Sequence, residues 1–145
     1  MTDVLPERLA EIRDEFLELS ESDRLQLLLE YSYELPAVPA EYEGHPELAE
    51  RVVECQSPVY IIVDVDTDGV VAMHATAPPE APTTRGFASI LVQGLTGLSA
   101  AEALAVPGDY PQTLGLTRVV SPLRISGMTG MLLRAQRQVR AKSAA

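Results

Sequence analysis

With 145 residues, 46% of them hydrophobic, the chain is long enough to bury its own core, and we expect residues 1–145 to form a single domain. The formal net charge of -10 argues against nucleic acid and anionic membranes as partners, because both are bound through Lys and Arg. A single cysteine, Cys55, excludes an internal disulfide and any four-thiolate zinc or iron–sulfur site within one subunit.

Two amphipathic helices are predicted at the front of the chain. Residues 20–23 are cap-forming side chains that separate the first helix from the second, and Leu35-Pro36 ends the second. Residues 35–46 hold three prolines, so we expect an irregular crossing segment there. The first helix is predicted from apolar residues that recur at steps of four and three: Leu5, Leu9, Ile12, Phe16 and Leu19.

A small antiparallel sheet is predicted next. Residues 51–53 favour a short strand, residues 59–65 are rich in β-branched side chains, and a turn at Asp68-Gly69 leads into a strand over residues 70–75. Residues 64–69 also match the start of a calcium-binding loop, but its twelfth position would be Ala75 instead of Glu. We therefore expect a hairpin turn and no metal site.

Helices are predicted for the rest of the chain. Beyond a proline-rich loop, Thr83 or Thr84 can cap a helix that Gly94 can end. Ser99 and Glu102 have the spacing of a capping box at the start of a short helix. A last amphipathic helix follows Ser121-Pro122. Two helices, a three-stranded antiparallel sheet and several further helices make an α+β arrangement.

Charge is distributed unevenly along the chain. Residues 1–54 contain 15 acids and 4 bases, whereas residues 114–145 contain 6 bases and no acid. The two ends are expected to attract each other or to engage different partners. Arg134, Arg137 and Arg140 fall on the last helix, where a solvated face is the favoured interpretation and a docking stripe for an acidic partner is the alternative.

Nothing in the sequence suggests a membrane or an exported protein. No apolar run approaches the roughly 20 residues that span a bilayer. The acidic first residues lack the basic and apolar regions of a signal peptide. We expect a soluble, cytoplasmic protein.

Cys55 is the residue with the clearest chemical potential. It falls in a predicted loop between strands, because Pro58 biases Ser57 away from helix. Loops often display reactive groups, but a free cysteine is more often a small buried apolar residue. From the residues alone, a structural cysteine is favoured. His45 and His74 offer no local Cys–His pair, so an independent cysteine hydrolase ranks last.

The segment around Cys55 resembles the cysteine loop of the SufE family. Residues 54–60 read ECQSPVY, where the family commonly has Gly-Cys-Gln-Ser followed by a hydrophobic strand. Glu54 replaces that glycine and places a carboxylate beside the thiol. Residues 77–91 resemble an actinobacterial version of the family. Further matches follow in the family's order: Asp68-Gly69, Arg85-Gly86, Leu114-Gly115-Leu116, and Ser121-Pro122-Leu123-Arg124 with Gly127.

This resemblance implies a SufE/IscU-like α+β fold. It also implies a function, because SufE-like proteins accept sulfane sulfur from a persulfide on the cysteine desulfurase SufS and pass it to the SufBCD scaffold for iron–sulfur cluster assembly. Cys55 would carry the sulfur transiently, with no bound cofactor, in an accessory protein that activates the desulfurase. In the family the thiol is sheltered in an apolar pocket, which raises its pKa until the loop moves.

The resemblance also implies residues that support the loop or the partner surface: Gln56, Ser57, Glu80, Arg85, Gly86 and Arg124. Arg124 would organise the cysteine loop or the partner surface, or else anchor a helix start. Glu80 is more simply interpreted as a solvated loop carboxylate, and Arg85 and Gly86 as fixing a helix entry. The alternative to sulfur transfer is a non-catalytic protein-binding module in which Cys55 is a structural core residue.

Overall fold

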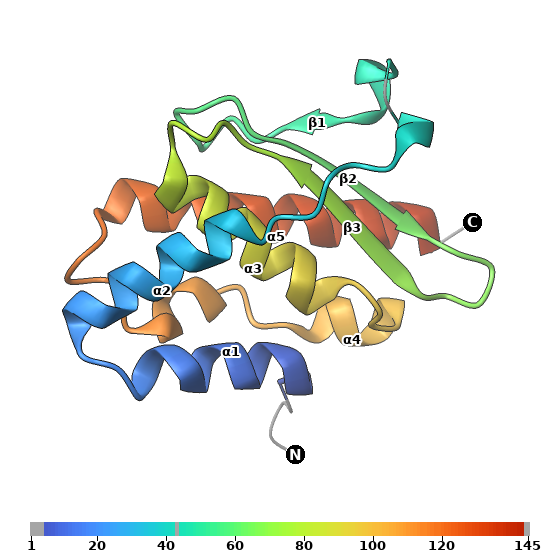
Figure 1. Ribbon diagram of the computed structural model, residues 1–145. Coiled ribbons are helices and arrows are strands. Elements are labelled where there is room, and N and C mark those ends of the chain that lie inside the picture. The colour runs from blue at the N-terminus through green and yellow to red at the C-terminus, as the bar shows by residue number, and fades with distance from the viewer. Residues whose placement is uncertain (1–4, 43, 144–145) are drawn as a thin grey trace.

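The computed structural model describes residues 5–42 and 44–143. Its architecture is α+β, as the sequence predicts, with helices before and after the sheet in chain order (Figure 1). The elements are α1 (Glu7–Leu17), α2 (Glu21–Tyr33), the 3-10 turns η1 (Ala40–Tyr42) and η2 (Pro46–Leu48), β1 (Glu50–Arg51), β2 (Tyr60–Val65), β3 (Val71–Thr76), α3 (Pro82–Leu95), α4 (Ala100–Ala105), the 3-10 turn η3 (Tyr110–Leu114) and α5 (Pro122–Ser143).

The two N-terminal helices form where their apolar spacing predicts. Leu9, Ile12 and Phe16 of α1 are fully buried. The hydroxyl of Ser20 accepts a hydrogen bond from the Asp23 N–H at 3.4 Å and so caps the start of α2. Both predicted helices are confirmed.

The sheet is antiparallel with the order β1-β2-β3. Between β2 and β3 the chain turns at Gly69, whose φ of +80° suits glycine. The Asp66 carboxylate holds this turn by accepting from the N–H groups of Asp68 and Val70, each at 2.9 Å. The first strand is shorter than predicted and ends at Arg51, because the chain turns away after Val52.

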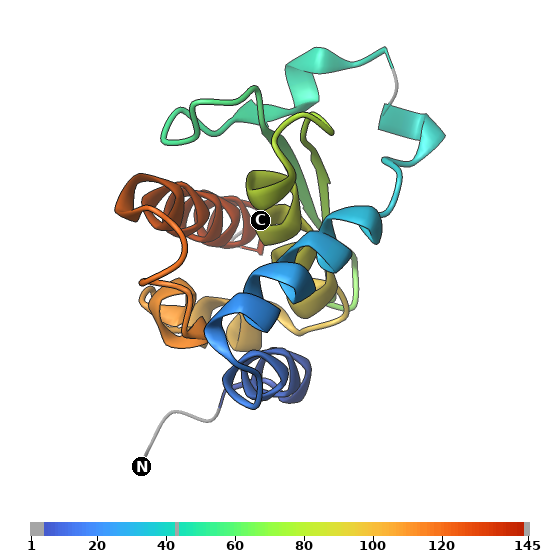
Figure 2. The same cartoon turned by 60° about the vertical axis from the view of Figure 1, so that its left-hand side comes forward.

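The helices stack on one face of the sheet. Figure 1 shows α3 and α5 next to the strands and α1 farthest from them, and Figure 2 shows the 3-10 turn η1 on the opposite side of the sheet from α5. Alternate residues of the paired strands face the helices and are almost fully buried: Ile61, Val63, Val71, Met73 and Ala75. The fold therefore places α5 directly against β2 and against the loop that precedes it.

Two helix boundaries differ from the prediction. Helix α3 begins at Pro82 with Ala81 as its N-cap and no capping side chain. The predicted threonine caps are therefore wrong, since proline at the first position needs no hydrogen-bond acceptor. The helix also continues through Gly94, where a Cβ would lie 2.1 Å from a methyl carbon of Leu9. The predicted capping box of Ser99 is present.

Within residues 5–42 and 44–143, no helix combines the length and the apolar character that crossing a membrane requires.

Candidate functional site

The cysteine loop, residues 52–59, joins β1 to β2. Val52 and Val59 at its two ends are fully buried, and the Val52 N–H donates to the Val59 carbonyl at 2.9 Å. Within the loop, the Cys55 N–H donates to the Val52 carbonyl at 3.1 Å, which closes a tight turn. The loop is thus anchored at its base and presents residues 53–58 beyond it.

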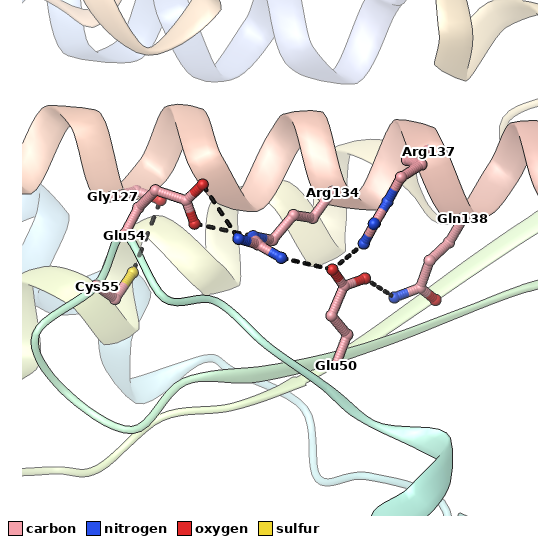
Figure 3. Close-up of polar contacts among 7 residues, drawn as sticks. All are labelled: Glu50, Glu54, Cys55, Gly127, Arg134, Arg137 and Gln138. Atoms are coloured by element: carbon pink, nitrogen blue, oxygen red, sulfur yellow. Dashed lines mark hydrogen bonds and ion pairs between the residues drawn. The ribbon is translucent and has the colours of Figure 1, made fainter.

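Cys55 lies against α5. The residue is only 7% exposed, and its S–H donates to the Gly127 carbonyl at 3.7 Å (Figure 3). A Cβ at position 127 would lie 3.1 Å from the sulfur. Helix and thiol therefore approach this closely because residue 127 is glycine.

The thiol is protonated at neutral pH. Burial, with a smaller contribution from the Glu54 carboxylate, raises the pKa of Cys55 to about 11, and the Arg134 guanidinium acts in the opposite direction. Since the thiolate is the nucleophilic form of cysteine, the thiol is nearly unreactive in this conformation. Neither histidine of the chain is positioned to change this, because His45 lies beside Glu47 and His74 lies against Tyr42.

A pocket of about 160 Å³ opens beside the thiol. It brings together four of the residues predicted for the site: Cys55, Gln56, Ser57 and Arg124. The remaining lining comes from the loop, α3 and the start of α5: Glu54, Thr84, Ser121, Leu123 and Gly127. The lining is mainly polar, which differs from the apolar shelter that the family resemblance implies. The apolar contacts of Cys55 lie behind it, where the residue joins the core.

Arg124 lies in the first turn of α5. Its N–H donates to the carbonyl of Ser121 at 3.0 Å and to the Ser121 hydroxyl at 3.3 Å. Its side chain is exposed and borders the pocket. The backbone of this residue therefore belongs to the helix start, while its guanidinium adds positive charge near the thiol.

The other three predicted residues lie outside the pocket. Arg85 donates to the Ser32 carbonyl at 2.9 Å and the Ala77 carbonyl at 2.6 Å, which ties the start of α3 to its surroundings. Gly86 is where α3 meets α2, because a Cβ there would lie 2.4 Å from the Leu28 carbonyl. Glu80 is exposed in the turn before α3.

An ion-pair network beside the loop was not predicted from the sequence (Figure 3). Arg134 of α5 contacts Glu54 at 2.8 Å and Glu50 of β1 at 2.7 Å. Arg137 also pairs with Glu50, and the Gln138 side chain donates a hydrogen bond to the Glu50 carboxylate at 2.9 Å. The expected solvated face is thus wrong for Arg134, whose side chain is 23% exposed. The uneven charge of the chain is the signal that could have indicated this pairing.

The hydrogen bonds of Arg134 lower the pKa of the Glu54 carboxyl, which outweighs the opposing effect of partial burial. Glu54 is therefore ionised at neutral pH, directly beside a protonated Cys55. The site therefore places the negative charge of Glu54 next to the thiol and the positive charge of Arg134 beyond it.

Comparisons with known proteins agree with this architecture. A family model described as SufE, Fe-S metabolism associated domain, matches residues 10–139. Uncharacterized SufE-like proteins of two Mycobacterium tuberculosis strains are 48% identical over 136 residues, which cover 94% of this chain and 94% of each relative. An uncharacterized SufE-like protein of Synechocystis is 32% identical over 124 residues, covering 85% of this chain and 74% of that protein.

A solved structure shares the fold. The solution structure of a hypothetical protein from Thermus thermophilus is similar with a TM-score of 0.85 and 37% sequence identity, covering 98% of this chain and 100% of that one. The family resemblance noted from the sequence is confirmed. The chain therefore belongs to the SufE family and is associated through it with iron–sulfur metabolism.

Proposed function

We propose that this protein accepts sulfur on Cys55 from a SufS-type cysteine desulfurase, activates that enzyme, and relays the sulfur to the SufBCD scaffold. The observation that carries the proposal is the position of the chain's only thiol, which borders a polar pocket on a loop anchored at both ends. A purely structural cysteine needs neither the pocket nor the loop. The proposed reaction takes place in the cytoplasm.

The transfer is a displacement at sulfur. The Cys55 thiolate attacks the terminal sulfur of the desulfurase persulfide and forms a new S–S bond, while the S–S bond of the donor breaks and its thiolate leaves. The proton lost from Cys55 balances the one that the departing thiolate takes up. No external oxidant or reductant is needed, because the sulfane sulfur moves at constant oxidation level.

The resting conformation protects the thiol. A pKa of about 11 keeps Cys55 protonated, which limits stray oxidation as well as transfer. Productive transfer requires Cys55 to leave the Gly127 carbonyl and meet the donor. Arg124 at the pocket edge supplies a positive charge that would favour the thiolate and the anionic persulfide there.

A protein-binding module with a structural Cys55 is the second candidate. It is favoured by a single observation, the 7% exposure of this residue within the buried core cluster. In that case the thiol would fill space and the charged helices would make the functional contact. Substituting the thiol separates the two candidates.

Intact-mass spectrometry tests the proposal. After incubation with a cysteine desulfurase, pyridoxal phosphate and cysteine, the wild-type protein is expected to gain one sulfur, about 32 Da, on its one thiol. Cys55→Ser is the matched control and should gain none, while its circular dichroism spectrum stays that of the wild type. Wild-type protein that gains no sulfur and leaves desulfurase turnover unchanged would refute sulfur acceptance and favour the binding module.

A further inference from the structure

One face of α5 is shaped to receive the cysteine loop. Gly127, Gly130 and Arg134 follow at steps of three and four and so share a face of the helix. A Cβ at position 130 would lie 2.7 to 2.9 Å from three side-chain carbons of Glu54, and one at position 127 would lie 3.1 Å from the sulfur of Cys55. Two consecutive loop residues therefore rest directly on two glycines of the helix.

Arg134 holds the first of these residues in place. Its Nε donates to one carboxylate oxygen of Glu54 at 2.8 Å and its Nη2 to the other at 3.3 Å. This is the two-point geometry in which arginine binds carboxylates most firmly. The remaining Nη1 donates to Glu50 at 2.7 Å, so that one guanidinium joins α5 to both β1 and the loop.

We propose that Glu54 and Arg134 form a latch that holds Cys55 against Gly127 and that must open before the thiol can react. Arg134 is in this sense a positioning residue, since it contacts the neighbour of Cys55 and not the sulfur. That the latch controls sulfur acceptance rests on the proposed function. That it slows the reaction of the thiol does not rest on it, because this rate can be measured on the isolated protein.

The loop is built for such a movement. Val52 and Val59 anchor its base in the core, so residues between them can shift without disturbing the sheet. On the helix side, the contact of Cys55 is a 3.7 Å hydrogen bond from sulfur, which is a weak donor. The charged pair of Glu54 is the stronger polar attachment of the loop to α5.

Charge and latching make opposite predictions for one substitution. The negative charge of Glu54 disfavours the Cys55 thiolate and the positive charge of Arg134 favours it. If charge alone mattered, Glu54→Gln would speed reaction of the thiol and Arg134→Gln would slow it. A latch predicts that both substitutions speed it, because either one frees the loop.

The test is the rate at which iodoacetamide alkylates Cys55 in the isolated full-length protein near pH 8. Glu54→Gln and Arg134→Gln are each expected to react about 1.4- to 5-fold faster than wild type, the range for loss of one surface ion pair. The double variant should gain little beyond either single one, because the latch breaks only once. Arg140→Gln removes the same charge from an exposed position further along α5 and should leave the rate unchanged.

Arg134→Lys provides the second measurement. It keeps the positive charge but loses the two-point contact with Glu54, so the latch predicts faster alkylation and charge alone predicts the wild-type rate. Circular dichroism and thermal melting must show that each variant is folded. An Arg134→Gln protein that is folded and reacts at or below the wild-type rate would overturn the latch. Because the assay contains no desulfurase, that result is distinct from a failure of sulfur acceptance.

Discussion

The reactivity of Cys55 should depend on pH far more steeply than that of an ordinary cysteine. Burial and the Glu54 carboxylate raise the pKa of Cys55 from its ordinary value of 9.0 to about 11, and Arg134 acts in the opposite direction. The charged residues that line the pocket beside the thiol are Glu54 and Arg124. At pH 8 the thiolate fraction is then about 0.1%, against about 9% for the ordinary thiol. The folded protein should therefore be alkylated roughly 100-fold more slowly than the unfolded chain.

Stopped-flow alkylation over about pH 7 to 10 measures this. The rate for the folded protein is expected to rise close to tenfold per pH unit throughout, because its pKa lies above the range. The same chain in concentrated urea is the internal control and should level off near pH 9. A folded-state rate that levels off below pH 9, or that lies within tenfold of the unfolded rate at pH 8, would refute the reasoning that burial holds this thiol protonated.

Two further predictions concern stability. Gly86→Ala should lower the free energy of unfolding, measured by urea titration, by about 3 kcal/mol, because the new Cβ would lie 2.4 Å from a backbone carbonyl of α2. Gly108→Ala is the control, since its Cβ would lie 3.7 Å from the nearest atom, and it should leave the free energy of unfolding nearly unchanged. Glu54→Gln should lower the free energy of unfolding by about 0.2 to 1 kcal/mol at pH 7. Arg134 lowers the pKa of Glu54 in the folded state, so the carboxylate stabilises the fold above its unfolded pKa. The difference in free energy of unfolding between this variant and wild type should therefore disappear as the pH falls below about 4. A difference that is the same at all pH values would contradict this reasoning.

Local signals in the sequence predicted most of the elements. The apolar spacing of α1, the Ser20 cap and the Ser99 capping box act within a few residues, and each produces the predicted helix. The start of α3 was predicted wrongly because Thr83 resembles a cap, whereas Pro82 already satisfies the first position of a helix. The 3-10 turn over Tyr110–Leu114 was not predicted, since such short turns lack a periodic pattern.

The site was predictable only in part. Cys55, Gln56 and Ser57 are consecutive, so their proximity follows from the sequence. Thr84 of α3 and Gly127 of α5 also line the pocket, and no local pattern in the sequence indicates that these two helices meet the cysteine loop. The pairing of Glu54 with Arg134 spans 80 residues; the uneven charge suggested that the two ends attract each other but could not select these partners.

The contact between Cys55 and Gly127 also has a consequence during synthesis. The two residues are 72 positions apart, so at roughly 5 to 20 residues per second the ribosome takes about 4 to 14 s to reach Gly127 after Cys55 has been added. Helix α5 covers the thiol and is the last of the described elements to be made. A nascent chain therefore carries an uncovered cysteine with an ordinary pKa, and protection from oxidation begins only when the last helix docks.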